Sequence, residues 1–269
     1  MLLFVLAAGL TLIFGLMRIV NMAHGSFYLL GGYIGLAVVE RTGSFGLALA
    51  ASAAAMAAIG VAMQRLCLSR LYKEELPQAL LTLGFLFIFA DLAYWIWGGN
   101  PVMISTPPML QGAVSFAGIG YPAYRLFLIA VGVAVAVALW LVMEKTLFGA
   151  VVRAGMDDEE MLRGLGTNVP VVFAGVFALG AGLAGAGGVL GGPLLGIFPG
   201  ADFEVALLAF VVVTVGGLGS IKGAFAGSLL VGLVDNFGNV WFPQLSLFSV
   251  FVPMALVLAV RPMGLMGRA

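Results

Sequence analysis

Long apolar runs separated by short polar stretches make up most of the chain. The runs are continuous rather than alternating and are rich in Ala, Leu and Gly, so they indicate helices rather than strands. A helix needs about 20 residues to cross a bilayer core of about 30 Å. We expect nine such helices, over residues 1–17, 25–39, 43–64, 77–97, 122–143, 170–190, 203–218, 223–240 and 247–260.

This pattern predicts an all-α polytopic membrane protein. We expect about eight to nine transmembrane helices, several of them short or broken at Gly, within one transmembrane domain over residues 1–269. The composition agrees, since 62% of the residues are apolar and 9% are charged, whereas a soluble domain carries about 25% charged residues. A water-soluble globule is therefore excluded.

Charge and motif content exclude further classes of protein. The net charge is zero, so no basic surface is available for nucleic acid, and the single Cys67 cannot form an internal disulfide. The sequence contains no phosphate-binding loop, zinc-protease or serine-hydrolase motif. We therefore expect neither an enzyme nor a cofactor or metal bound by this chain.

The basic residues predict the orientation in the membrane, because cytoplasmic loops retain Lys and Arg. Alternate connections hold ten of the 12 basic residues: Arg18, Arg65, Arg70, Lys73, Lys145, Arg153, Arg163, Lys222, Arg261 and Arg268. The other connections hold Arg41 and Arg125. We expect the C-terminus in the cytoplasm and the N-terminus outside. No signal-peptide pattern precedes Arg18, and the chain opens within its first helix, which suggests a trimmed or late start.

A polar stretch joins the first two apolar runs. It contains Arg18, Asn21 and His24, followed by Gly25. Either it is a tight turn in which Asn21 or Ser26 caps the next helix, or its irregular backbone lines a cavity or gate. His24 is the only histidine and has no partner at a metal-ligand spacing. We keep Asn21, His24 and Gly25 as candidates for the translocation path.

Glycines mark two further departures from regular helices. One is the turn between the seventh and eighth runs, where we take Gly216, Gly217, Gly219 and Ser220 as further path or gate candidates. The other is 180–192, with seven glycines in 13 positions. This stretch either packs closely against neighbouring helices or deforms during transport.

Four acidic residues lie within or beside the predicted spans, towards the external side. They are Asp91, Asp202, Glu204 and Asp235. A charge inside a bilayer is costly unless it faces water or a partner, so Asp91 and Asp235 are path candidates. Together the four carboxylates could receive an ammonium group. The alternatives are that Asp235 marks a helix end and that Asp91 reaches a water-filled crevice.

The most informative polar stretch is 144–169, which we call the coupling segment. Its residues 156–165 predict one short amphipathic helix. The first turn is acidic (Asp157, Asp158, Glu159, Glu160), an apolar edge follows (Met161, Leu162, Leu165), and Gly166 ends the helix. Such a helix can dock in a groove of a soluble partner, whereas an acidic face disfavours a position on anionic lipid.

Four stretches of the chain resemble the LivH-type permeases of ATP-binding-cassette (ABC) importers for branched-chain amino acids. They are GLTLIFGLMRIVNMAHGSFYLLGGY (9–33), RAGMDDEEMLRGLGTNV (153–169), AFVVVTVGGLGSIKGAFAGSLLVGL (209–233) and RPMGLMG (261–267). The resemblance implies that the segment beginning at Arg153 docks on an ATPase. Members of this family usually carry additional residues before the first span.

The resemblance also implies the partners. They are a LivM-type permease as heterodimer partner, two cytoplasmic ABC ATPases that hold ATP and Mg, and an external substrate-binding protein, all at a bacterial inner membrane. Leu, Ile and Val are the implied substrates, with urea, short amides or other small polar solutes as alternatives.

A rival of a different class is a secondary transporter driven by an ion gradient, with Asp91 and Asp235 as proton or sodium sites.

Overall fold

The computed structural model describes residues 1–116, 119–241 and 243–267. Part of the external loop (117–118) and the predicted cytoplasmic Arg268 lie outside these ranges. Each of the nine predicted helices is present: α1 (Leu2–Met17), α2 (His24–Thr42), α3 (Phe45–Leu66), α4 (Glu75–Trp97), α5 (Ala123–Lys145), α8 (Val169–Leu195), α9 (Ala201–Gly216), α10 (Ile221–Trp241) and α11 (Ser246–Val260). Shorter elements lie between them: η1 (Leu68–Leu71), η2 (Pro108–Leu110), α6 (Leu147–Asp157), α7 (Glu159–Gly164) and η3 (Pro243–Leu245).

The number of membrane crossings differs from the prediction. Within the described residues, α3, α4, α5 and α8 are long and apolar enough to cross a membrane alone. Helices α9 and α10 bend by 115° at a short break and together count as at most one more span, while α1 and α11 are shorter apolar helices. The protein is thus an all-α polytopic membrane protein, but eight to nine full-length spans are not confirmed. The prediction counted the two halves of the bent pair as separate spans, and it also counted α1, α2 and α11, none of which is among the helices long and apolar enough to cross alone.

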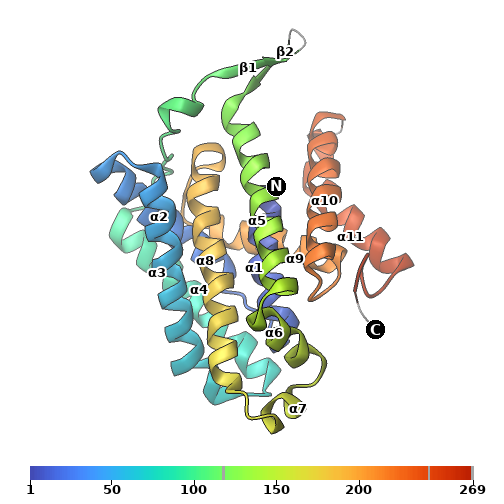
Figure 1. The fold of residues 1–269 in the computed structure, drawn as a ribbon. Helices are drawn as coiled ribbons and strands as arrows, with labels where there is room; N and C mark the ends of the chain where they lie inside the picture. The colour runs from blue at the N-terminus through green and yellow to red at the C-terminus, as the bar shows by residue number, and fades with distance from the viewer. Residues whose placement is uncertain (117–118, 242, 268–269) are drawn as a thin grey trace.

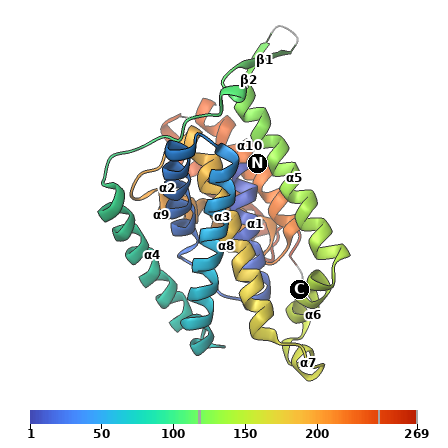
Figure 2. The ribbon, with the colours of Figure 1, turned by 60° about the vertical axis from the view of Figure 1, so that its left-hand side comes forward.

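Helix α8 runs through the middle of the bundle and packs on α1, α2 and α3 (Figure 1). Helix α4 lies on one flank and α5 on another (Figures 1 and 2), while α10 packs on α1 and α9, and α11 packs on α9 and α10. An antiparallel hairpin of β1 (Ala113–Phe116) and β2 (Ile119–Pro122) projects from one end, which we call the hairpin end. Helices α6 and α7 lie at the opposite end, the coupling end.

Close glycine contacts hold α8 to its neighbours. A Cβ at Gly9 would come 2.5 Å from the carbonyl oxygen of Gly180, and a Cβ at Gly31 would overlap Gly185. The Ser52 hydroxyl, 2.8 Å from the carbonyl oxygens of both Gly31 and Gly185, can donate to either. The packing interpretation of 180–192 is confirmed, because glycine lets helix backbones approach this closely.

The connection between α1 and α2 is an irregular, non-helical segment inside the bundle. It is not the tight turn that was one of the two alternatives from the sequence. His24, the first residue of α2, lies 2.9 Å from the carbonyl oxygen of Leu6 through its Nε2 atom. Leu6 is 11 residues from the end of α1, or about 16 Å along the helix. Residues 18–23 therefore run back along α1 before α2 begins.

Side chains of α4 partner this irregular backbone. The Thr82 hydroxyl accepts a hydrogen bond from the Met22 amide at 3.1 Å and can donate to the Val20 carbonyl at 3.3 Å. The predicted caps were wrong, because the N-cap of α2 is Ala23 without a side-chain hydrogen bond and the Ser26 hydroxyl instead donates to Asp202. An inserted polar segment is tolerated where protein groups replace its lost backbone partners.

The break between α9 and α10 is a glycine turn closed by the C-terminal tail. Gly217 and Gly219 have φ of 104° and 80°, a conformation that favours glycine. The amides of Leu265 and Met266 donate to the carbonyls of Val215 and Gly216, each at 2.9 Å. The tail thus satisfies carbonyl groups that the end of α9 leaves free.

Candidate functional site

The coupling segment forms two helices rather than the single helix predicted over 156–165. Helix α6 ends at Asp157, and Asp158 adopts an extended backbone before α7 begins. The Asp158 carboxylate accepts a hydrogen bond from the Met161 amide at 2.9 Å, so it caps α7. Helix α7 ends at Gly164, and Gly166 follows with φ of 81°. The acidic run therefore contains a helix boundary that an amphipathic pattern does not reveal.

The acidic residues of α7 attach it to the residues that follow η1. The Tyr72 hydroxyl donates to Glu159, which also pairs with Arg163 at 2.8 Å. Burial, followed by the hydrogen bond and charge of Glu159, raises the pKa of Tyr72 to about 12. Lys73 pairs with Glu160 at 2.9 Å and lowers the pKa of that carboxyl below its usual value. These contacts hold α7 against the bundle.

The apolar edge of α7 divides into a buried and an exposed part. Leu162 is 5% exposed and packs into the bundle near Val152 and Phe173, so it does not face a partner. Met161 and Leu165 are 67% and 78% exposed. These two side chains are the exposed part of the predicted apolar edge.

Met156, near the end of α6, touches both breaks in the bundle. A Cβ added at Gly15, near the end of α1, would come 2.7 Å from Met156 Cε and 2.9 Å from Gly219 Cα. A Cβ at Gly219 would lie 3.3 Å from the same Met156 atom. A displacement of α6 would therefore press directly on the end of α1 and on the turn between α9 and α10.

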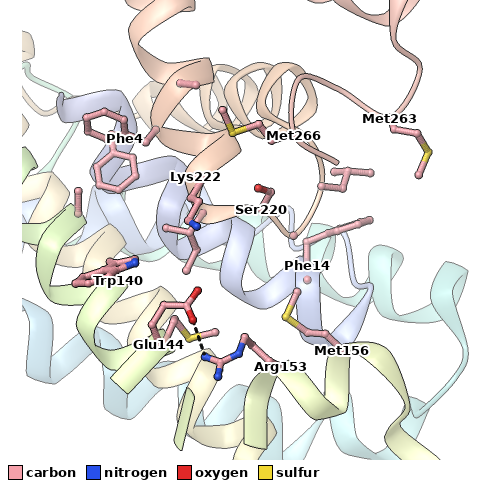
Figure 3. A pocket seen from close by; sticks show the side chains of 18 of the residues that line it. Phe4, Phe14, Trp140, Glu144, Arg153, Met156, Ser220, Lys222, Met263 and Met266 are labelled. Atoms are coloured by element: carbon pink, nitrogen blue, oxygen red, sulfur yellow. Dashed lines mark ion pairs between the residues drawn. The ribbon is translucent and has the colours of Figure 1, made fainter. Parts of the chain in front are cut away.

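Beside this contact lies a cavity of about 1190 Å³, bounded by α1, α5, α6 and the turn before α10 (Figure 3). Its walls include the apolar side chains Phe4, Phe14, Trp140, Met143 and Phe225. Its charged lining residues are Arg18, Glu75, Glu144, Arg153, Asp157 and Lys222. Of these, Arg153 and Glu144 pair at 3.7 Å (Figure 3). A cavity with apolar walls and with both acidic and basic residues can accept a zwitterion that carries an apolar side chain.

The four path candidates in the turn between α9 and α10 lie in two different surroundings. Gly219 and Ser220 line the cavity, and the Ser220 hydroxyl accepts a hydrogen bond from the Gly223 amide at 3.1 Å. Gly216 and Gly217 are buried in the same turn, against Gly223 and the C-terminal tail.

Asn21, His24 and Gly25 are buried within the bundle and line neither this cavity nor the neighbouring one of about 360 Å³. At Gly25, a Cβ would overlap the carbonyl oxygen of Asp202. Glycine is therefore required there for the approach of α2 to the start of α9.

The four predicted acids do not form one site within the described residues, where no group of three His, Cys, Asp or Glu side chains is placed to hold a metal. Asp202 is 2% exposed and accepts from Ser26. Asp235 accepts from Asn239 and from Ser249 of α11, at 3.2 and 3.3 Å, so it joins two helices rather than ending one. Asp91 lies on the exposed face of α4.

Two parts of the site were not anticipated from the sequence. Met156 was expected only to begin an amphipathic helix, and Gly15 carried no role. The C-terminal tail was noted as a family motif, without its hydrogen bonds to α9. All of these depend on contacts between distant segments, which a single sequence does not display, although paired glycines at both breaks were a visible signal.

Comparisons with known proteins identify the family of the chain. Residues 1–260 match the profile of a family described as the permease component of the branched-chain amino acid transport system. The high-affinity branched-chain amino acid transport permease BraD of Pseudomonas aeruginosa is 30% identical over 286 residues, covering 98% of this chain and 91% of that protein. The Escherichia coli permease LivH is 26% identical over 280 residues, covering 98% and 90%.

A probable LivH permease of Methanocaldococcus jannaschii is 25% identical over 283 residues, covering 99% of this chain and 89% of that protein. No solved structure gives a significant match. The profile match and the relatives both extend over nearly the whole chain, including both breaks and the coupling segment. The chain belongs to the permease family of branched-chain amino acid transport systems.

Proposed function

We propose that this chain is a permease subunit of an ATP-driven ABC importer that moves Leu, Ile and Val into the cell by alternating access. The observation that carries the proposal is the contact of Met156 with Gly15 and Gly219, next to an exposed docking edge on α7. The similarity to BraD and LivH, which are branched-chain amino acid transport permeases, supplies the substrate class. The chain itself then carries no enzyme activity and needs no cofactor, since ATP and Mg belong to the ATPases.

In this proposal, the ATPase drives transport because it binds the two conformations of the permease with different affinities. An ATPase that seats Met161 and Leu165 in a groove gains apolar burial. If ATP binding moves that groove, α6 moves with it, and Met156 transfers the displacement to the ends of α1 and α9. ATP then shifts the permease between outward- and inward-facing states to the extent that the ATPase binds one state more tightly.

The cavity beside Met156 is the proposed inner section of the path. Its apolar walls suit a branched side chain, and its charged residues suit a carboxylate and an ammonium group. Gly219 and Ser220 lie where a movement of the coupling segment changes the shape of this cavity. Gly216, Gly217 and the buried Asn21, His24 and Gly25 support the moving helices in this scheme.

The proposed setting is a bacterial inner membrane, with the coupling end and the C-terminus in the cytoplasm and the N-terminus outside. The hairpin end would then receive substrate from an external binding protein. A LivM-type permease and two ABC ATPases complete the complex, surrounded by lipid and without nucleic acid. The count of eight to nine crossings also belongs to this proposal, with α1, α11 and the two halves of the bent pair α9–α10 as short crossings.

Affinity purification of the tagged chain from its native membrane in mild detergent tests the assembly. We expect an ABC ATPase and a second permease in the eluate. The total number of ATPase chains should equal the total number of permease chains. Replacing Met161 and Leu165 together by Glu should deplete the ATPase and keep the second permease. An intact, folded chain that never recovers an ATPase contradicts the importer.

A further inference from the structure

Helix α4 has one face in the bundle and one face outside it. The buried face consists of Gln78, Thr82, Leu86, Phe89 and Ala93, which pack on α2 and on the irregular backbone before it. The opposite face, which we call the α4 stripe, consists of Leu80, Gly84, Phe87, Ile88, Asp91 and Trp95. These residues recur at helical spacing along about four turns of exposed surface.

Asp91 makes this stripe unsuited to lipid. It lies about 9 Å from the end of α4 at Trp97 and about 24 Å from the start at Glu75, so it lies at membrane depth. It forms no hydrogen bond or ion pair with a described residue, and large apolar side chains flank it, with Phe87 60%, Ile88 59% and Trp95 83% exposed. An unpaired charge at this depth is costly, so a polar partner must cover it.

Gly84 gives that partner a close approach. Among the described residues, no other helix or loop brings an atom within 4 Å of a Cβ built there, and Gly84 is two helical turns from Asp91 on the same face. Small residues beside an intramembrane polar group are the combination by which membrane helices associate. The stripe therefore fits another transmembrane helix better than water or an acyl chain.

The exposed part of α8 shows the contrast. It includes Val171 and Leu179, which are 52% and 40% exposed, and α8 contains no charged residue. Among the four long spans of the described chain, α4 alone carries a charged residue more than one turn from either end. An aliphatic surface such as that of Val171 and Leu179 on α8 is compatible with lipid, whereas the α4 stripe is not.

We infer that the α4 stripe packs against the second permease subunit, whose facing helix supplies a hydrogen-bond donor or cation to Asp91. This inference rests on the proposed function, since in that complex the second permease is the partner embedded at the same depth. It places α4 at the boundary between the two permeases. Asp91 is there a positioning residue for assembly, and its carboxylate does not act as an ion site of a lone transporter.

Photo-crosslinking from single positions tests the interface. A benzophenone amino acid replaces Ile88 on the α4 stripe or, as a control on an exposed uncharged surface, Leu179 on α8, in the complex purified from native membranes. We expect position 88 to form an adduct with the second permease and position 179 to label lipid. A fully assembled complex in which position 88 labels only lipid, or in which position 179 captures the second permease, overturns the inference but leaves the importer intact.

Substitution of Asp91 provides the second test. Asp91→Leu should lower recovery of the second permease roughly 3- to 20-fold, the range expected for one hydrogen bond between membrane helices, while Asp91→Asn should largely retain it. Equal recovery with Leu, Asn and the original Asp overturns the inference. If the unsubstituted chain recovers neither a second permease nor an ATPase, the proposed function fails, and the inference fails with it.

Discussion

At the scale of single residues, the carbonyl oxygen of Asp202 occupies the space that any side chain at position 25 would need. Backbone atoms yield less readily than the end of a flexible side chain. Gly25→Ala should therefore push α2 away from α9 and cost about 1–3 kcal/mol or more of stability.

The measurement is the apparent Tm of the detergent-purified protein. Gly46→Ala is the matched control, because Gly46 is also helical and a Cβ there meets no atom of another described segment within 4 Å. We expect a clear drop in Tm for Gly25→Ala and little change for the control. Equal Tm values for the two variants would show that α2 does not pack on α9 as described.

Tyr72 provides a prediction on pH. Its pKa is raised to about 12, so the neutral phenol that donates to Glu159 stabilises the fold fully below pH 10. This contribution disappears as the pH rises through about 12. The Tm difference between the original protein and Tyr72→Phe should therefore be constant from about pH 6 to 9, and a difference that vanishes within that range would contradict the assignment.

For single residues, the sequence indicated which residues were unusual but not which contacts they make. Gly25 and Asp202 were correctly noticed as unusual, but their mutual contact joins residues far apart in the chain. Leu162 was placed on a docking edge because helical spacing shows one apolar face, without showing which part the bundle covers. The burial of a residue in a short helix depends on the neighbouring elements and cannot be derived from the helical periodicity of apolar residues alone.

At the scale of elements, α7 divides its apolar residues between the bundle and a partner. The double substitution of Met161 and Leu165 by Glu should weaken ATPase binding at least about 10-fold and leave the Tm of the isolated permease unchanged, since both side chains are exposed. Leu162→Ala should instead lower the Tm. Binding is checked by titrating labelled ATPase onto the reconstituted permease, and undiminished affinity of the double variant would exclude this docking edge.

Met156 links the coupling helices to the broken ones. Met156→Ala removes its contact with Gly15 and Gly219, so ATP hydrolysis should continue while uptake per ATP falls at least about 5-fold. Met109→Ala is the control, since Met109 is 95% exposed, lies outside the cavity and is not among the nearest atoms to either glycine. Unchanged uptake per ATP in Met156→Ala would remove Met156 from the transmission of movement.

The elements themselves were largely predictable. Apolar runs located all nine main helices, because membrane helices bury continuous apolar sequence. The break at Asp158 and the hairpin of β1 and β2 were missed, since one depends on a cap within an acidic run and the other on a short pairing in a polar loop. The return of residues 18–23 along α1 was missed because polarity marks a break without giving its direction.

At the scale of the whole molecule, the chain is a central α8 packed through glycines, with a coupling end, a hairpin end and an uncovered α4 stripe. Each of these surfaces faces a different partner in the proposed importer. A secondary transporter would instead need its acids gathered on a path within one chain, and Asp91 and Asp235 lie on separate helices with different surroundings.

Uptake of radiolabelled leucine into liposomes distinguishes these accounts most directly. The purified complex of this chain with its second permease and ATPases should accumulate leucine when ATP and the substrate-binding protein are both supplied. Omission of either should abolish uptake, and this chain alone should give none under a proton or sodium gradient. Leucine accumulation by the chain alone, driven by such a gradient and lost in Asp91→Asn, would contradict the importer.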